Sequence, residues 1–116
     1  MALIRRSEMF EGCPLPGWSG HFFHSEYMTF AHWDIQSTAA DLHEHQHPQE
    51  EVWNIVEGEL VLVLNGREWR LGPGDAAVVP PETPHSVRVV GMCRAVIADY
   101  PVRETLPGVQ GSSSAA

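Results

Sequence analysis

The stretch His45-Gln46-His47-Pro48-Gln49-Glu50-Glu51 decides how we interpret this chain, together with the later stretch Pro80-Pro81-Glu82-Thr83-Pro84-His85. Side chains two residues apart point to the same face of a β-strand, so His45 and His47 share a face. Imidazole nitrogens and a carboxylate suit a divalent first-row metal such as Fe, Mn, Ni, Cu or Zn. The predicted ligand set of this single metal site is His45, His47, Glu51 and His85. The alternative is a polar pocket that has lost its metal.

The composition limits the possible functions. The chain has 116 residues, of which 43% are hydrophobic, enough for the core of one domain. Its formal net charge is −8, and all seven basic residues are arginines. The absence of lysine excludes lysine Schiff-base chemistry, and an acidic surface argues against nucleic acid or an anionic membrane as a partner. The two cysteines, Cys13 and Cys93, are too few for a disulfide scaffold.

The rest of the pattern predicts an all-β chain. Nine prolines and ten glycines divide it into short segments, as in a sandwich or barrel with roughly eight to ten strands. Asn65-Gly66 is the strongest hairpin signal, and no segment has a helical period. The clearest predicted strands are Phe22–Ile35, Glu51–Val56, Glu59–Leu64, Arg67–Leu71, Ala76–Val79, Ser86–Val90 and Met92–Tyr100.

Some of these strands are apolar on both faces, notably 60–64 and 95–98. Such a strand needs a second layer outside the barrel, and in a small protein a second subunit can supply it. We therefore expect a homodimer. Residues 1–11 lack an apolar run of signal-peptide length, and no stretch approaches the roughly 18 apolar residues of a membrane-spanning helix. We expect a cytoplasmic protein without a membrane partner.

Two motifs resemble those of the cupin family. His45-x-His47-x3-Glu51-x6-Gly58 resembles the first cupin motif, and Gly74-x5-Pro80-x4-His85 resembles most of the second. The resemblance covers about residues 28–100 and implies a double-stranded β-helix, or jelly roll, with the three histidines and Glu51 as metal ligands. It divides the chain into an N-terminal arm (1–27), a cupin barrel (28–100) and a C-terminal tail (101–116) whose end we expect to be disordered. The departures from the family pattern, none of them at a ligand position, are Ala39, Glu82 and Val89.

Other residues are candidates for the pocket. Trp53 and Ile55 share the face of Glu51 and are expected to form its apolar wall. The weak candidates for acid–base catalysis are His43, His32 and Asp34. His43 can equally be a surface residue, and His32 and Asp34 matter only if their face of the strand lines the barrel. Arg88 and Arg94 could contact a carboxylate substrate, but a surface position is favoured.

These observations support a metal-dependent enzyme acting on a small organic molecule. Three histidines and one carboxylate leave open coordination positions for O₂ or a substrate oxygen. The resemblance implies a dioxygenase, isomerase, decarboxylase or lyase, and we expect a dioxygenase- or isomerase-type reaction. The alternative is a non-catalytic module that binds a small molecule or a metal. A third hypothesis is that the chain is a structural protein that has kept the fold without the metal.

Overall fold

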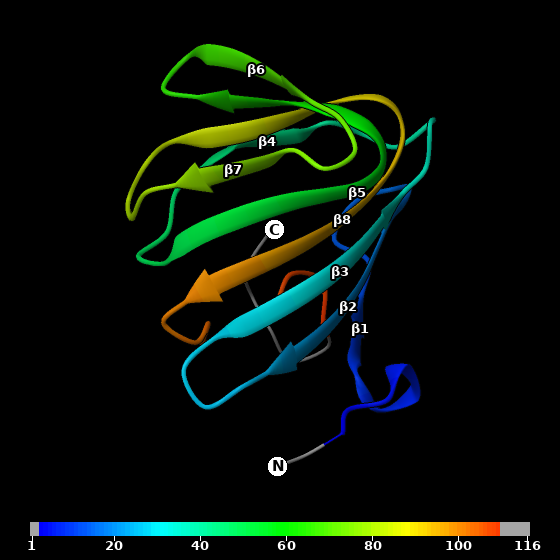
Figure 1. Cartoon of the computed structure of the whole chain (residues 1–116), viewed down its shortest axis with the longest axis vertical. Coiled ribbons are helices and arrows are strands. Elements are labelled where there is room, and N and C mark those ends of the chain that lie inside the picture. The colour runs from blue at the N-terminus through cyan, green and yellow to red at the C-terminus, as the bar shows by residue number, and fades with distance from the viewer. Residues whose placement is uncertain (1–2, 110–116) are drawn as a thin grey trace.

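The computed structural model describes residues 3–109 and contains one short 3₁₀ turn and eight strands (Figure 1). None of the helical structure within residues 3–109 has the length and apolar character needed to cross a membrane. The elements are η1 (Arg6–Glu8), β1 (Phe10–Gly12), β2 (Trp18–His24), β3 (Thr29–Ile35), β4 (Leu42–His45), β5 (Glu50–Leu64), β6 (Arg67–Leu71), β7 (Ala76–Val79) and β8 (His85–Tyr100). The predicted all-β class is confirmed.

All strand pairs are antiparallel, and two long strands organise them. The order along the sheet is β1-β2-β3-β8-β5-β6, while β4 pairs with β8 and β7 pairs with β5. The 15-residue β5 and the 16-residue β8 therefore have neighbours on both sides along their length. Figure 1 shows β5 and β8 running diagonally between a group formed by β4, β6 and β7 and a group formed by β1, β2 and β3. This is the jelly-roll arrangement that the two sequence motifs led us to expect.

The sequence divided each of these long strands in two, and that division is wrong. We predicted separate strands on either side of Gly58 and of Gly91, but β5 and β8 continue through them. The register between β5 and β8 shifts on both sides of Gly58, as expected of a bulge. Gly58 has a φ of 76°, and a Cβ there would overlap the carbonyl oxygen of Met92. A glycine that looked like a turn signal therefore allows two backbones to approach closely.

The predicted hairpin at Asn65-Gly66 is confirmed. It joins β5 to β6, with Leu64 opposite Arg67 in the ladder. Both turn residues have positive φ, 48° for Asn65 and 79° for Gly66. A two-residue hairpin turn of this kind needs that conformation at both positions, which explains the residue types.

The core lies between the inner faces of the strands. In β3 alternate residues are buried, with Thr29, Ala31, Trp33 and Ile35 facing inward. Trp33 meets Trp18 and Phe22 edge-to-face at ring-centroid distances of 5.3 Å for each pair. This aromatic group packs on the inner face of β2 and β3.

Both ends of the described chain contribute to the barrel. Strands β1 and β2 lie within the predicted 1–27 arm and join the same sheet as the rest. After β8, residues 101–109 fold back behind β3 and β8 (Figure 1) and bury Leu106 and Pro107. The backbone N–H of Arg103 donates to the Thr29 hydroxyl at 2.9 Å, which fixes this segment to β3. The expected disorder at the end of the tail falls on residues 110–116, outside the described part.

Candidate metal centre

Four segments bring the predicted ligands together. His45 ends β4, His47 follows in the loop, Glu51 is the second residue of β5 and His85 begins β8. His45 and His85 are directly opposite each other across the β4–β8 pair. Their ring centroids lie 4.2 Å apart, and the His47 ring lies 5.7 Å from that of His45 and 4.9 Å from that of His85.

The three imidazoles are held by their Nδ1 atoms. His45 Nδ1 lies 3.1 Å from the His43 carbonyl oxygen, and His85 Nδ1 lies 2.8 Å from that of Thr83. His47 Nδ1 makes the same kind of contact with the carbonyl oxygen of Gln49, at 3.2 Å. A carbonyl oxygen only accepts, so each Nδ1 must carry the proton and donate. In the neutral imidazole this leaves the Nε2 lone pair available to a metal.

Glu51 is the carboxylate of the cluster and is 5% exposed. Its Oε2 lies 3.0 Å from His85 Nε2 and 3.7 Å from His47 Nε2. The Trp53 indole N–H donates to the same oxygen at 3.1 Å, which orients the carboxylate. Burial alone would raise the pKa of Glu51, but the nearby His47 and His85 outweigh it and hold that pKa below its usual range.

The pKa values of His45 and His85 shift in opposite directions. Burial lowers the pKa of His45 to about 4, against weaker opposing contributions such as its hydrogen bond with the His43 carbonyl. Burial also acts to lower the pKa of His85, but the adjacent Glu51 carboxylate more than offsets this, so the pKa of His85 is raised. A neutral His45 and an ionised Glu51 are the protonation states that metal binding requires.

Two buried nitrogens in the cluster lack a hydrogen-bond partner within the described residues. They are the Nε2 atoms of His47 and His85, whose side chains are 8% and 1% exposed. The 3.0 Å contact between His85 and Glu51 is an ion-pair distance without hydrogen-bond geometry. Leaving such groups unsatisfied is costly, and a bound cation would satisfy them. The ligand atoms of His45, His47 and His85 all lie within 4.8 Å of one another, so the donor set fits a transition metal.

Comparison with known proteins agrees with this architecture. The protein-family model described as the cupin domain matches residues 31–99, which is more than half of the chain. This chain belongs to the cupin family. A curated relative, the HTH-type transcriptional regulator PuuR of Escherichia coli, is 34% identical over 58 residues, which are 48% of this chain and 31% of that protein. The chain thus spans about a third of the length of this relative.

Solved structures share the fold of this cupin. KdgF from Halomonas has a TM-score of 0.78 at 23% identity, covering 89% of this chain and 97% of that one. An RmlC-like cupin from Shewanella frigidimarina also has a TM-score of 0.78, at 19% identity, with coverages of 90% and 94%. Salicylate 1,2-dioxygenase from Pseudoaminobacter salicylatoxidans has a TM-score of 0.68 at 17% identity, covering 73% of this chain and 25% of that one. At these identities the likeness extends to the fold alone.

A narrow cavity leads from the cluster into the aromatic core of this cupin. Its volume is about 20 Å³, room for about one water-sized molecule. Trp53 lines this cavity, whereas Ile55 is buried in the core but does not line it. Each two-residue step along β5 carries the side chain about 7 Å further from Glu51, which explains the difference. The lining residues are Trp18, Phe22, Ala31, Trp33, Leu42, His45, Glu51, Trp53, Ile97, Asp99, Arg103 and Pro107.

Two polar residues of the cavity were missed from the sequence. Asp99 is 4% exposed, and its backbone lies opposite Glu51 in the β5–β8 ladder. Burial, followed by the negative charge of Glu51, raises the pKa of Asp99 to about 8. Arg103, at 8% exposure, lies with its Nη1 3.7 Å from Asp99 Oδ2. One signal was present, since Asp99 continues the inward alternation Cys93, Ala95, Ile97 and so places a carboxylate in an apolar row.

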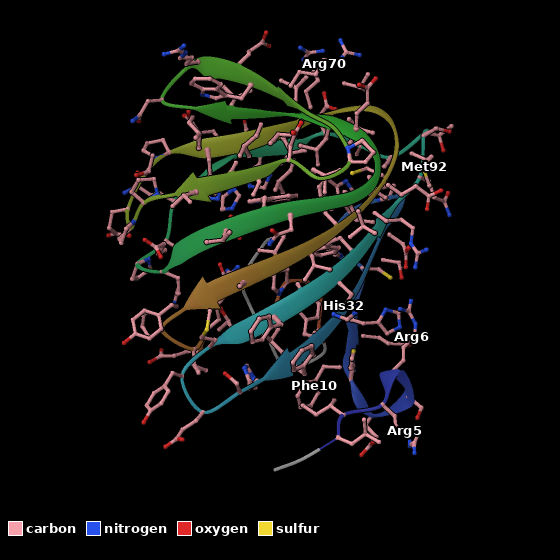
Figure 2. All side chains as sticks on the ribbon, viewed as in Figure 1. Arg5, Arg6, Phe10, His32, Arg70 and Met92 are labelled. Atoms are coloured by element: carbon pink, nitrogen blue, oxygen red, sulfur yellow. The ribbon has the colours of Figure 1, made fainter. Side chains whose placement is uncertain are left out.

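The weak catalytic candidates lie elsewhere. His43 is exposed, with its ring centroid 6.1 Å from that of His45, at the rim of the cluster. His32 and Asp34 lie on the outer face of β3, because the inward positions are those of Trp33 and its alternate neighbours. Figure 2 shows His32 beside Arg6 on the outside of the sheet. The option that His32 and Asp34 line the barrel is therefore wrong.

The two arginines considered for substrate binding are surface residues. Arg88 pairs with Glu68 at 3.1 Å, and Arg94 pairs with Asp34 at 2.8 Å. Both arginines are about half exposed, with side-chain exposures of 51% and 52%. The favoured surface position is thus the observed one.

Proposed function

We propose that this cupin is a metal-dependent enzyme of the dioxygenase or isomerase type that acts on a small organic molecule. One divalent transition metal would be held by the predicted ligands His45, His47, Glu51 and His85. The main observation in support of the proposal is the orientation of the three imidazoles. Each ring is bound through Nδ1 to a backbone carbonyl, which leaves its Nε2 available to a metal, and the ligand atoms of the three rings lie close together. When bound, the ion supplies Lewis acidity or redox chemistry.

The surrounding residues have separate tasks in this proposal. The indole of Trp53 holds one oxygen of Glu51 and so fixes the direction of the carboxylate. Trp18, Phe22 and Trp33 form an apolar wall that excludes water from the cavity. Asp99 lies buried in the cavity opposite Glu51, and this burial raises its pKa, so it is the candidate to pass a proton to or from a bound molecule.

The small cavity supports a second candidate function. A volume of about 20 Å³ suits a metal with a very small ligand better than it suits an extended substrate. A non-catalytic module that binds a metal or a small molecule would need no more space. The fold does not decide between the two functions, because one fold can host many different functions.

Two measurements on reconstituted protein distinguish the candidates. The protein is loaded with Fe²⁺, Mn²⁺, Ni²⁺, Cu²⁺ or Zn²⁺ and screened with small organic molecules for oxygen uptake and for isomerised product. Water-proton relaxation of the Mn²⁺ form then reports whether an exchangeable water reaches the ion. Turnover with at least one metal, lost in His47→Ala and kept in His43→Ala, supports the enzyme. Binding of the metal without exchangeable water or turnover would favour the non-catalytic module.

A further inference from the structure

Asp99 is a buried carboxylate that the four predicted metal ligands do not account for. It is 4% exposed and lines the same cavity as Glu51, which is 5% exposed. Its Oδ2 lies 3.7 Å from the Nη1 atom of Arg103, but its Oδ1 is buried without a hydrogen-bond partner within the described residues. Leaving a buried carboxylate oxygen unpartnered is costly, so its position needs an explanation.

The register of the sheet brings two carboxylates together. Glu51 and Asp99 are opposite each other in the β5–β8 ladder, and both line the cavity inside the barrel. One ligand atom from each of them, and one from His47, all lie within 4.8 Å of one another. Two buried carboxylates this close repel each other when both are ionised. A cation between them removes that repulsion and gives the unpartnered oxygen of Asp99 a partner.

The pocket therefore contains two overlapping groups of possible ligands that differ in chemistry. The first, which we call the imidazole position, is formed by His45, His47 and His85 and offers three nitrogens. The second, the carboxylate position, is formed by His47, Glu51 and Asp99 and offers one nitrogen and two carboxylates. Glu51 also adjoins the imidazole position, with its Oε2 3.0 Å from His85 Nε2. Imidazole suits Zn, Cu, Fe and Ni, whereas carboxylate oxygens suit the harder ions Mg, Ca and Mn.

We propose that the pocket holds a divalent ion at either of these two positions, and that Asp99 is a ligand of a hard ion such as Mn²⁺ at the carboxylate position. This rests on the proposed function for the existence of a metal site, and it adds which residues hold which ion. The cavity beside Glu51 and Asp99 has a volume of about 20 Å³, enough for one water-sized particle and therefore for a bare ion. An ion at the imidazole position leaves Asp99 available to carry a proton, whereas an ion at the carboxylate position engages it as a ligand.

The test compares two ions in three variants. Mn²⁺ affinity is measured by electron paramagnetic resonance of the free ion, and Zn²⁺ affinity by competition with a chromogenic chelator. Asp99→Asn keeps the size of the side chain and removes its charge, while His45→Ala removes a ligand of the imidazole position alone. Asp34→Asn makes the same chemical change as Asp99→Asn, but on the outer face of β3, and is the matched control. Circular dichroism monitors the fold of each variant.

We expect Asp99→Asn to reduce Mn²⁺ affinity by about tenfold or more and Zn²⁺ affinity much less, because zinc binds at the imidazole position. The lost charge weakens the binding of both ions, so the ratio of the two effects is the quantity that decides. His45→Ala should have the reverse preference, and Asp34→Asn should change neither affinity. Because Asp99→Asn weakens an ion pair with Arg103 and can unfold the protein, X-ray absorption of the unmodified protein is a second measurement. It should find more imidazole ligands on zinc than on manganese.

Several results would overturn the carboxylate position. These are an equal loss of Mn²⁺ and Zn²⁺ affinity in a folded Asp99→Asn variant, unchanged affinity for both ions, or the same number of imidazoles on both ions. Such results would mean that Asp99 and Glu51 compensate their charges in another way, for example through a shared proton, and they would leave the imidazole position standing. Binding of neither ion to the unmodified protein would refute the carboxylate position together with the proposed function.

Discussion

Two pairs of histidines face each other across neighbouring strands, and they differ in which face of the sheet they occupy and in the partners that hold their rings. His45 and His85 are opposite each other in the β4–β8 pair, while His21 and His32 are opposite each other in the β2–β3 pair. The first pair lies inside the barrel and is joined by His47. The second lies on the outer face of the sheet.

The partners of the outer pair explain why it forms no comparable cluster. His21 Nε2 lies 3.1 Å from the exposed carboxylate of Glu11. His32 meets the ring of Phe23 edge-to-face at 5.7 Å, and burial followed by the charge of Arg6 lowers its pKa. In the inner pair both Nδ1 atoms are bound to backbone carbonyls, which turns the Nε2 atoms toward one another. A candidate metal centre is thus defined by anchored, converging rings beside a buried carboxylate, and not by histidines in register.

The largest expected contrast is between His47→Ala and His32→Ala. Removing His47 takes one converging nitrogen from the inner cluster, so metal affinity should fall by at least about 100-fold while the barrel stays folded. Removing His32 should leave metal affinity unchanged. Competition with a chromogenic zinc chelator measures both, and circular dichroism monitors the fold. Equal affinities in the two variants would refute the ligand assignment.

The second contrast is in how the stability of the metal-free protein depends on pH. The pKa of His45 falls to about 4 in the folded protein, from an ordinary value of 6.5. Between these values the unfolded chain binds more protons, so stability is complete above pH 6.5 and falls as pH drops toward 4. His85 has a raised pKa and acts oppositely, stabilising below pH 6.5 and losing this effect as pH rises through its folded value.

Urea unfolding between pH 4 and 7 measures this dependence. His45→Gln should flatten the loss of stability between pH 6.5 and 4, and His32→Gln should change it less because its pKa shift is smaller. An unchanged slope in His45→Gln would mean that another group causes the acid loss.

A smaller effect is expected from the residue that orients Glu51. Trp53→Phe keeps the aromatic ring but removes the N–H that donates to Glu51 Oε2. Metal affinity should drop about tenfold, the lower end of what such supporting hydrogen bonds contribute. Trp69→Phe, on the exposed side of β6, is the matched control and should bind metal like the unmodified protein. Identical affinity in both variants would show that Glu51 needs no help from the indole.

The smallest effect is expected from a substitution on the outer face of β3. Asp34→Asn removes a carboxylate that pairs with Arg6 at 3.2 Å and with Arg94 at 2.8 Å, all three being substantially exposed. The free energy of unfolding should fall by less than about 1 kcal/mol, and metal content should not change. Chemical denaturation and elemental analysis check the two statements. A loss of metal in this variant would connect the outer network to the inner cluster.

The expected homodimer stays a prediction, and exposed apolar residues on β5, β7 and β8 are candidates for its interface. Val56, Val78 and Tyr100 are large apolar residues with more than half of their surface exposed. A second subunit covering them would bury this apolar surface, although none of the three lies in the strands at 60–64 and 95–98. Light scattering of the purified protein would measure the mass directly.

Spacing along the chain predicted the part of the site that lies within motifs. His45, His47 and Glu51 are close in sequence, and the position of His85 followed from the second motif. The hairpin at Asn65-Gly66 was predictable because only a few residue types accept its backbone conformation. These features depend on local geometry, which a sequence displays.

The remaining features depend on register and on contacts distant in sequence. Asp99 faces Glu51 only because β8 pairs with β5 in one particular register, whereas the alternation along β8 indicates only which face Asp99 occupies and not which residue lies opposite it. Arg103 belongs to a segment that the sequence placed in the C-terminal tail, outside the barrel, and only its contact with β3 shows that this segment packs there. The face to which His32 points was undecided because alternation gives two faces without saying which one is inside.

Elemental analysis of untagged protein, purified without chelator, tests the central claim most directly. About one transition-metal ion per chain, absent from His47→Ala prepared in the same way, is the result that the account predicts. Iron or manganese would direct further work to oxygen uptake, and nickel or zinc to isomerase and lyase reactions. No metal in the unmodified protein, even after reconstitution with each candidate ion, would contradict the account.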